Sequence, residues 1–373
     1  MRIGVEAQRI LRYKKHGMDF VVLELLKQLQ KIDTINEYFI FCAPGPDKEV
    51  IKETPNFKLI FFSAPYPIWE QYLLPKQVKR LNLDLLHSTS NTAPIRVSSK
   101  MVVTVHDIIF LETSFWKKGY TAYQRFGNLY RKWNVPRILK KADRIITVSN
   151  FEKKNLLNAG FDASKIEVVY NGVGAHFKVI ENKQILEQAK NKYNLPDKYI
   201  LFLGNTDPKK NTPNTLLAFA QYCKKYGTNY KLVVADLTES YARQVLNDAN
   251  LQEFKEAIYF AGYVNNHDLP CIINTASLFL YPSKRESFGI PLLEAMKCGV
   301  PVITGQTSSL PEIAGDAALK VDVSKTEAIA EAIHQVLTSE ALRNTLIKNG
   351  LERSGDFSWA NSANKVLDIY KAM

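Results

Sequence analysis

Short β-rich runs alternate with longer helical runs from one end of the chain to the other, and no other feature restricts the fold as strongly. Strand-like runs of a first series lie at residues 2–7, 37–43, 57–63, 83–88, 100–107, 143–149 and 166–173. Those of a second series lie at 199–205, 230–236, 257–264, 276–283 and 301–306. Strands that alternate with helices form parallel sheets with helices on both faces. The sequence therefore predicts an α/β protein with two Rossmann-like, doubly wound domains.

The two series predict two domains that face one another across a cleft. We expect an N-terminal domain over residues 1–174 and a C-terminal domain over 198–355. Residues 175–197 carry few strand signals and are expected to form a linker region. Residues 356–373 are expected to form a helix that returns to the N-terminal domain. Ligands of doubly wound sheets bind beyond the carboxyl ends of the strands, so the cleft between the domains is the expected site.

Composition is typical of a soluble globular enzyme, with 46% hydrophobic and 23% charged residues. No apolar run reaches the roughly 18 residues that span a bilayer. The N-terminus lacks the long apolar segment of a secretory signal. The four cysteines lack C-x-x-C spacing, which argues against a zinc site or a disulfide framework. We therefore expect a cytoplasmic protein without a structural metal.

Positive charge is concentrated in the first half of the chain. Residues 1–170 hold 27 Lys and Arg against 16 Asp and Glu, whereas 171–373 hold 22 against 21. This asymmetry suggests an anionic partner: membrane phospholipid, a pyrophosphate-linked lipid or nucleic acid. A merely solvated basic face is the alternative. Nucleic acid is the weakest candidate, because no helix-turn-helix, zinc-finger or RNP pattern is present. Basic and aromatic residues interleave at 115–133, a stretch that overlaps an expected helix over 120–141, which favours peripheral attachment to the inner membrane face.

The stretch "RESFGIPLLEAMKCGVP", residues 285–301, carries the main candidate site. Glu286 follows a predicted strand and so lies at a carboxyl end, where ligands bind. Gly289 permits close approach of the backbone, and Pro291 suits the first turn of a helix. The free N–H groups of that helix could bind a phosphate. Glu294, one turn further on, is placed to accept hydrogen bonds from sugar hydroxyls. A helix-dipole charge and a polar surface residue are the structural alternatives.

Two further sets of residues follow predicted strands. "GNTDPKKN", from Gly204 to Asn211, places Lys209 and Lys210 where ammonium groups could neutralise a diphosphate, unless the turn is simply solvated. It matches neither the P-loop nor the G-x-G-x-x-G pattern. His106 and Asp107 end a strand in the basic half, and their adjacency favours a catalytic role over a structural one.

Taken together, these residues identify a family resemblance. The chain resembles the retaining, metal-independent GT-B glycosyltransferases usually called family 4, because Glu286 and Glu294 match their E-x7-E motif within "ESFGIPLLEAMKCGVPVI". Four shorter stretches are similar to other family blocks: "LPEIAGDAAL", "VSNFEKKNL", "VVYNGV" and "FAGYV". The resemblance spans the chain and implies a nucleotide-diphosphate sugar as donor, no cofactor, and transfer of a hexose to a lipid-linked or polysaccharide acceptor.

The resemblance also implies roles for single residues. Glu286 would contact the donor sugar, Glu294 the ribose hydroxyls and Lys210 the donor phosphates. The remaining roles fall on positions that match family motifs: amides of Phe288, Gly289 and Ile290 at the diphosphate, the base near Tyr263 and Val264, His106 near the sugar, and Gly17 at the first helix. The chain departs from many members in having Asn205 after Gly204, Lys209 where they have Arg, and a single glycine at the first turn.

Other functions share parts of this pattern. A GT-B nucleotide-sugar 2-epimerase would use the same donor site, a carbohydrate phosphorylase would need a phosphate or cofactor pocket, and a non-catalytic nucleotide-sugar-binding protein would need no acceptor. The "GNTDPKKN" loop is similar to that of bacterial mannosyl-type members, which favours a mannosyl donor. The donor base, the acceptor and the linkage are not specified by the sequence.

Overall fold

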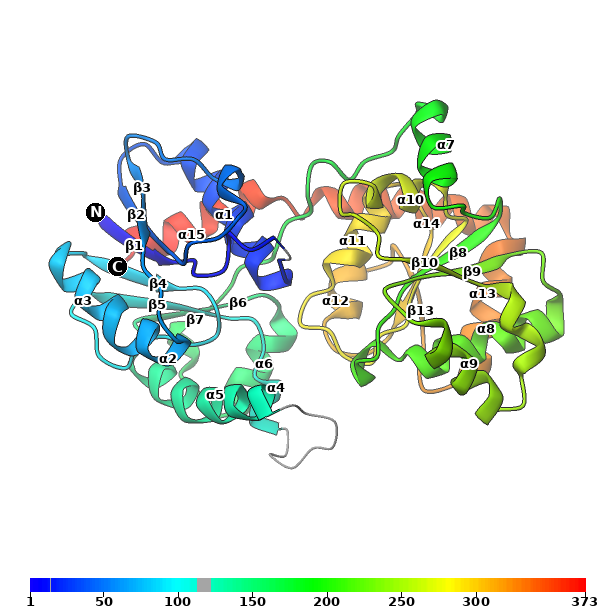
Figure 1. The fold of residues 1–373 in the computed structure, drawn as a ribbon, viewed down its shortest axis with the longest axis horizontal. Coiled ribbons are helices and arrows are strands. Elements are labelled where there is room, and N and C mark those ends of the chain that lie inside the picture. The colour runs from blue at the N-terminus through cyan, green and yellow to red at the C-terminus, as the bar shows by residue number, and fades with distance from the viewer. Residues whose placement is uncertain (14, 113–121) are drawn as a thin grey trace. The chain divides into compact units, whose positions relative to one another are not determined.

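The structure is a computed structural model of the 373-residue chain, and it describes residues 1–13, 15–112 and 122–373. The chain divides into two compact units (Figure 1). Unit 1 consists of Met1–Gly172 together with Trp359–Met373, and unit 2 consists of Val173–Ser358. Each unit contains one parallel sheet. The predicted α/β architecture with two Rossmann-like sheets is confirmed.

Unit 1 is built on a seven-stranded parallel sheet of order β3-β2-β1-β4-β5-β6-β7. The strands are β1 (Arg2–Glu6), β2 (Glu37–Cys42), β3 (Phe57–Phe61), β4 (Leu85–Ser88), β5 (Lys100–Val105), β6 (Arg144–Thr147) and β7 (Ile166–Val168). They are predominantly apolar, and most of their residues are buried because helices cover both faces. The strand order reverses between β1 and β4, which is the switch point where doubly wound sheets bind ligands.

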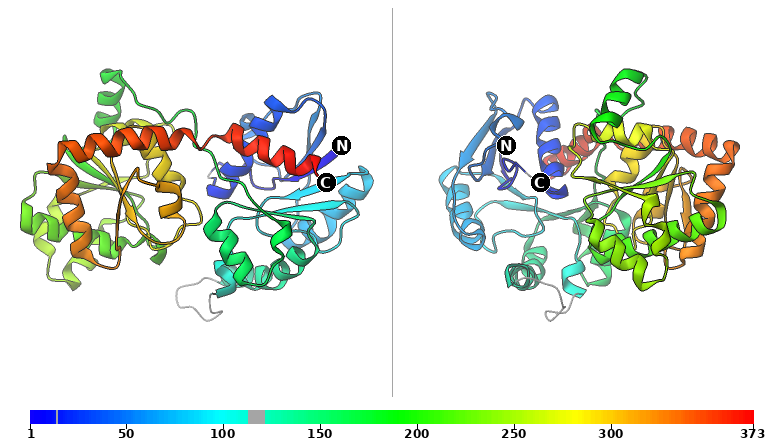
Figure 2. Two further views of the ribbon diagram at one scale, coloured as in Figure 1. Left: turned by 180° about the vertical axis from the view of Figure 1, so that it is seen from behind. Right: turned by 45° about the vertical axis from the view of Figure 1, so that its right-hand side comes forward.

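The helices of unit 1 follow the strands in sequence. They are α1 (Gly17–Ile32), η1 (Lys48–Val50), α2 (Tyr66–Ile68), the π-helical turn η2 (Trp69–Leu73), α3 (Leu74–Arg80), α4 (Ile109–Glu112), α5 (Ala122–Lys141), α6 (Asn150–Asn158) and η3 (Ala163–Lys165). The helix expected over 120–141 begins in the described chain at Ala122, and 113–121 lie outside the described residues. The last helix, α15 (Trp359–Lys371), packs on α1 (Figure 2). Its buried residues, such as Val366 and Tyr370, join the core that contains Ile3 and Leu26.

Unit 2 repeats the same topology in a six-stranded parallel sheet of order β10-β9-β8-β11-β12-β13. Its strands are β8 (Tyr199–Leu203), β9 (Lys231–Ala235), β10 (Ile258–Gly262), β11 (Leu278–Tyr281), β12 (Val302–Gly305) and β13 (Leu319–Val321). The last of these, only three residues long, was not predicted from the sequence. The order reverses between β8 and β11, so the switch point of this unit lies between those two strands.

Helices cover the sheet of unit 2 as well. They are α7 (Lys183–Lys192), η4 (Pro208–Lys210), α8 (Thr212–Tyr226), α9 (Glu239–Asp248), η5 (Gln252–Ala257), α10 (Leu269–Thr275), α11 (Ile290–Lys297), α12 (Leu310–Ala314), α13 (Thr326–Thr338) and α14 (Glu340–Gly355). Helix α7 occupies the segment 175–197, for which a linker was expected, and it packs on α10. The structure groups that segment with unit 2 because these contacts tie it to the domain.

Candidate functional site

An ion pair marks the switch point of unit 2. Lys210 ends the turn η4 that follows β8, and Glu286 lies in the loop that follows β11, so the strand order brings the two together. Lys210 Nζ lies 2.7 Å from Glu286 Oε1, and the two side chains are only 17% and 12% exposed. Lys210 Nζ also donates to Tyr281 Oη over 3.2 Å and lies 5.1 Å from the centroid of that ring. Sequence reasoning missed Tyr281. The signal that could have pointed to it is its hydroxyl group at the carboxyl end of an otherwise apolar strand, β11.

Lys209 and Lys210 have different environments although they are neighbours. The Lys209 side chain is 43% exposed and lies 3.7 Å from the exposed Asp207. Asp207 Oδ1 accepts from the Lys209 amide and so caps the turn, while the Lys209 carbonyl accepts from the Lys284 amide over 2.7 Å. Lys209 therefore fixes the loop through its backbone, and Lys210 is the lysine whose ammonium group points into the cluster.

The helix predicted after Glu286 is present, and its first turn is built as the sequence suggested. Gly289 precedes α11 with φ of +105°, a conformation that favours glycine, and Ile290 is the first helical residue. A Cβ on Gly289 would lie 3.2 Å from Leu310 Cδ2. Phe288 is buried, and its ring packs edge-on against that of Phe357. The amides at 288–290 thus lie at a helix start, where an anion is favoured.

Glu294 lies in α11 and is partly buried. Burial raises the pKa of its carboxyl group from the usual 4.5 to about 8. The shift comes from burial, and no positively charged side chain of the described residues offsets it. The group is therefore largely protonated near neutral pH, and a ligand that donates hydrogen bonds to it would favour the charged form.

Two serines that the sequence analysis did not single out hold the Glu286 loop. Ser308 Oγ accepts from the Glu286 amide over 3.0 Å. Ser309 Oγ lies within donating distance of two carbonyls, 2.9 Å from that of Glu286 and 3.0 Å from that of Phe288. These contacts lie between the loops that follow β11 and β12, which are neighbouring strands. The backbone around Glu286 is consequently fixed on both sides of its Cα.

The other candidates of unit 2 lie at the ends of β8 and β10. Gly204 directly follows β8, and a Cβ there would lie only 2.3 Å from Phe202 Cε1, so a side chain does not fit. Val264 is 8% exposed, and the preceding Tyr263 is 63% exposed. Both follow an irregularity in the pairing of β10 with β9 between Phe260 and Gly262. All the ends of β8, β10 and β11 therefore carry candidate residues.

In unit 1, His106 follows β5 and is 7% exposed. Its amide donates to Asn91 Oδ1 over 2.7 Å, and its Nε2 lies 3.0 Å from the Thr89 carbonyl oxygen. A carbonyl can only accept, so Nε2 carries the hydrogen. Burial lowers the pKa of His106, which favours the neutral ring with Nδ1 as an acceptor. Asp107 accepts from the Ile109 amide and so begins α4.

Gly17 is the first residue of α1, and nothing lies within 4 Å of a Cβ placed on it. Unit 1 therefore gives no steric reason for glycine at this position. His16 and Asp19 form a capping box at the same helix start. Arg9, which sequence reasoning missed, lies with its Nε 3.1 Å from Asp19 Oδ1. Its position just beyond β1 is the signal that could have pointed to it.

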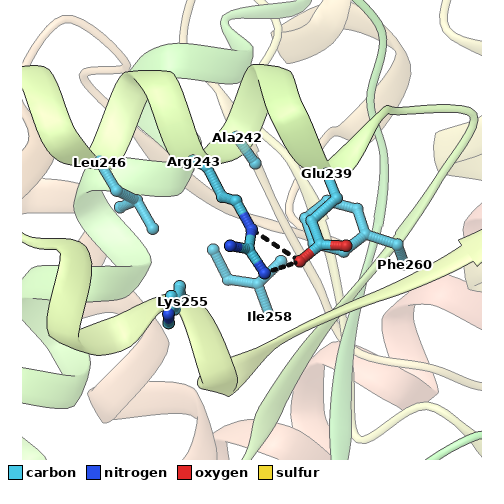
Figure 3. Close-up of a pocket in the computed structure, with 7 residues that line it drawn as sticks. All are labelled: Glu239, Ala242, Arg243, Leu246, Lys255, Ile258 and Phe260. Carbon is cyan, nitrogen blue, oxygen red and sulfur yellow. Dashed lines mark hydrogen bonds and ion pairs between the residues drawn. The ribbon is translucent and has the colours of Figure 1, made fainter.

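Two other features do not add to the site. Across residues 1–13, 15–112 and 122–373, no group of three or more His, Cys, Asp or Glu side chains could hold a metal ion. A small pocket in unit 2 lies between α9, η5 and β10 (Figure 3). The ion pair of Glu239 with Arg243 lies on its wall, and the lining includes Leu246, Ile258 and Phe260. These residues are apart from those that follow the switch-point strands.

Two family models match the chain. "Glycosyl transferases group 1" matches residues 183–353, and "Glycosyltransferase Family 4" matches residues 16–176. Together they cover most of both units.

Similar proteins agree with these models. "O-antigen chain mannosyltransferase B" of Escherichia coli is 28% identical over 97% of this chain and 98% of its own. "Serotype-specific mannosyltransferase WbdA" of Escherichia coli is 29% identical over 76% of this chain, which corresponds to 35% of that longer protein. Among solved structures, Anabaena Alr3699/HepE in complex with UDP and glucose has a TM-score of 0.77 at 16% identity, with 100% of both chains covered. This last likeness bears on the fold alone.

Proposed function

Since the chain belongs to family 4 of the glycosyltransferases and has the GT-B fold, we propose that it is a retaining enzyme of cell-surface glycan synthesis. It moves a hexose of the mannosyl type from a nucleotide-diphosphate sugar to a lipid-linked or polysaccharide acceptor. The observation that carries this proposal is the Lys210–Glu286 pair at the switch point of unit 2. The mannosyl assignment follows the names of the relatives, which are O-antigen and serotype-specific mannosyltransferases.

Residue roles follow from the chemistry of the donor. Lys210 supplies positive charge for the diphosphate, together with the amides at the start of α11. Glu286 accepts hydrogen bonds from the donor sugar, and Glu294 accepts them from the ribose. Preorganised positive charge stabilises the leaving diphosphate in the transition state. The nucleotide base of the donor lies near Val264. Gly204 leaves room for the donor beside β8.

Unit 1 contributes the acceptor side. His106, as a neutral ring with Nδ1 as acceptor, receives a hydrogen bond from a sugar hydroxyl. Asp107 follows β5, and the first turn of α1 at Gly17 follows β1 in the chain. Both strands belong to the same sheet. We infer that transfer needs no metal ion, because Lys210 and the helix start provide the charge that a divalent cation would otherwise supply.

The acceptor side also has a surface suited to an anionic membrane. Three large apolar side chains on α5 are exposed: Phe126 at 60%, Leu129 at 51% and Trp133 at 43%. Arg137 lies with its guanidinium 5.4 Å from the centroid of the Trp133 ring. Exposed apolar side chains beside basic ones are typical of interfacial helices. Within the described chain, no helix is both long and apolar enough to cross a bilayer. We propose that attachment is peripheral and from the cytoplasmic side.

The test is a panel of nucleotide sugars, offered with and without lipid-linked glycan acceptors. We expect thermal stabilisation by the correct donor and transfer of its sugar with retained anomeric configuration. Interconversion of the free donor at C2 would instead indicate the 2-epimerase, and binding without transfer to any acceptor would indicate a sensor.

A further inference from the structure

A buried carboxyl group lies at the switch point of unit 1, outside the residues assigned above. Glu70 is fully buried and lies in the π-helical turn η2. π-helical turns are rare in proteins, and those that do occur are often found at functional sites. Thr92, one of its partners, is in the loop after β4, which flanks the switch point between β1 and β4. No side chain with an opposite charge is among its hydrogen-bond partners in the described chain.

Three oxygen atoms around Glu70 form a closed triangle. Tyr66 Oη lies 2.8 Å from Glu70 Oε1, Thr92 Oγ1 lies 2.5 Å from the same oxygen, and the two hydroxyl oxygens lie 2.8 Å apart. All three distances are those of hydrogen bonds, and each hydrogen bond needs its own hydrogen. The two hydroxyl groups supply only two. A proton on Glu70 Oε1 would supply the third, with Glu70 then donating to one of the two hydroxyl oxygens.

The second oxygen of Glu70 is occupied by donors. Tyr130 Oη and Gln71 Nε2 both donate to Glu70 Oε2, and Gln71 Nε2 lies 3.0 Å from the Ala93 carbonyl oxygen. Burial raises the pKa of Glu70, and the hydrogen bonds from Thr92, Tyr130 and Tyr66 lower it by less than burial raises it. The charge of Glu6, at the end of β1, acts in the same direction as burial. Both effects favour the protonated form that the triangle requires.

The loop that Glu70 holds also holds His106. Thr92 is the contact with Glu70, and Asn91 accepts from the His106 amide over 2.7 Å. At the beginning of the loop, the Thr89 carbonyl oxygen lies 3.0 Å from His106 Nε2. Asn91 has φ of +66°, so its conformation needs support from its surroundings. Because Asn91 and Thr92 are buried and adjacent in the sequence, a shift of Thr92 would be expected to move Asn91 and the His106 amide bound to it.

We propose that Glu70 is a neutral carboxylic acid that fixes Thr92 and thereby helps to position His106 for sugar transfer. This inference rests on the function proposed for His106. Glu70 is a positioning residue, since it acts through Thr92 and not on the substrate. Its role is to keep Nδ1 of a neutral His106 in one orientation.

The first experiment tests the proton. Glu70→Gln replaces the acid by an amide whose two N–H groups can donate to Tyr66 and Thr92, and whose oxygen can accept from Tyr130 and Gln71. We expect kcat within about threefold of the wild type, and loss of one protonated-carboxyl band in the infrared difference spectrum between the two proteins. Two results together would overturn the proposal: loss of a carboxylate band instead of a protonated-carboxyl band on replacing Glu70, and a kcat of Glu70→Gln as low as that of Tyr66→Phe.

The second experiment tests the coupling to His106, with a matched control. Tyr66→Phe and Tyr38→Phe each remove a tyrosine hydroxyl that is hydrogen-bonded to a carboxyl group in unit 1, since Tyr38 Oη lies 2.6 Å from Asp33 Oδ2. Only the Tyr66 hydroxyl belongs to the triangle. We expect Tyr66→Phe to lower kcat between about tenfold and hundredfold with KM for the donor nearly unchanged, and to shift the His106 ring resonances. Tyr38→Phe should leave both unchanged.

Equal effects of the two tyrosine substitutions on kcat and on the His106 resonances would show that Glu70 has only a structural role. His106→Ala separates this outcome from a failure of the proposed function. If His106→Ala retains full transfer activity, the role of His106 is wrong. If it loses activity while Tyr66→Phe matches Tyr38→Phe, only the positioning role is wrong.

Discussion

Lys210 and Glu286 form a direct ion pair, with Nζ and Oε1 2.7 Å apart and both side chains mostly shielded from solvent. The pairing joins a residue that follows β8 to one that follows β11, on the two sides of the switch point. Each group therefore has a charged partner before any donor binds. A donor whose phosphates approach Lys210 and whose sugar approaches Glu286 would exchange this contact for two others.

Lys210→Ala should weaken use of the nucleotide sugar, because it removes a charge-assisted contact to the diphosphate. We expect a loss of about 1.5–3 kcal/mol in kcat/KM for the donor. Lys209→Ala is the matched control, since the Lys209 side chain is 43% exposed and its ion pair with Asp207 spans 3.7 Å. Steady-state kinetics of both variants decide the matter. Damage by Lys209→Ala with a silent Lys210→Ala would assign the phosphates to the other lysine.

Glu286→Gln should reduce turnover much more than folding stability. The amide keeps the shape of the side chain, and the backbone contacts with Ser308 and Ser309 do not depend on its charge. We expect kcat to fall by about 10²-fold or more, with a thermal midpoint within a few degrees of the wild type. His106→Ala should behave in the same way. Unfolding of Glu286→Gln would show instead that the ion pair is mainly structural.

Nucleoside diphosphate binding should strengthen as the pH rises towards 8. The pKa of Glu294 is raised from 4.5 to about 8, so its contribution to folding stability is fully present below pH 4.5 and is lost as the pH rises towards 8, where the folded protein must bury the charged form. Ribose hydroxyls donate to the carboxylate form, so binding releases a proton in this window. We expect affinity to rise by at most about tenfold per pH unit.

Calorimetry in buffers of different ionisation enthalpy measures that proton directly. Glu294→Gln is the control, because it cannot ionise, and its affinity should be flat over the same range. A wild-type affinity independent of pH would contradict the assignment of Glu294 to the ribose.

Removal of divalent cations should leave donor binding and transfer unchanged. Lys210 and the amides at 288–290 neutralise the diphosphate in our proposal, so EDTA removes nothing that the site requires. Binding isotherms and initial rates with EDTA and with added Mg²⁺ test this directly. A strict requirement for Mg²⁺ in both assays would show that the charge of Lys210 is insufficient.

The protein should bind anionic vesicles and release them at high salt. Basic residues near an anionic surface contribute about 1 kcal/mol each, over a distance close to the Debye length. Co-sedimentation with anionic and neutral vesicles across a salt series is the measurement. Trp133→Ala should weaken attachment by removing an apolar contact, whereas Leu351→Ala, an exposed apolar residue of unit 2, is the control. Equal binding to both kinds of vesicle would favour an acceptor in solution.

The two sheets could be predicted because their strands are nearly continuous apolar runs bounded by turns. Glu286 and Lys210 could be proposed because each follows such a run, and the E-x7-E spacing is local in the sequence. Their direct contact could not be predicted, since 76 residues separate them and only the strand order joins them. The same holds for Glu70, whose hydrogen-bond partner Tyr130 is 60 residues away. Strand β13 escaped prediction because its three residues include Lys320 and do not belong to a longer apolar run, whereas the equally short β7 lies within the run 166–173.

The position of α15 has a consequence for the order in which the protein matures on the ribosome. Unit 2 is a single uninterrupted stretch, whereas unit 1 is completed only by Trp359–Met373. Tyr370 is fully buried there, with its hydroxyl 2.6 Å from His87 Nδ1 in β4. The first unit to be translated is therefore the last to be finished. Until residues 359–373 have been synthesised, the apolar residues that α15 covers in this core, such as Ile3 and Leu26, lack that cover, so the newly made N-terminal half is expected to need protection from aggregation.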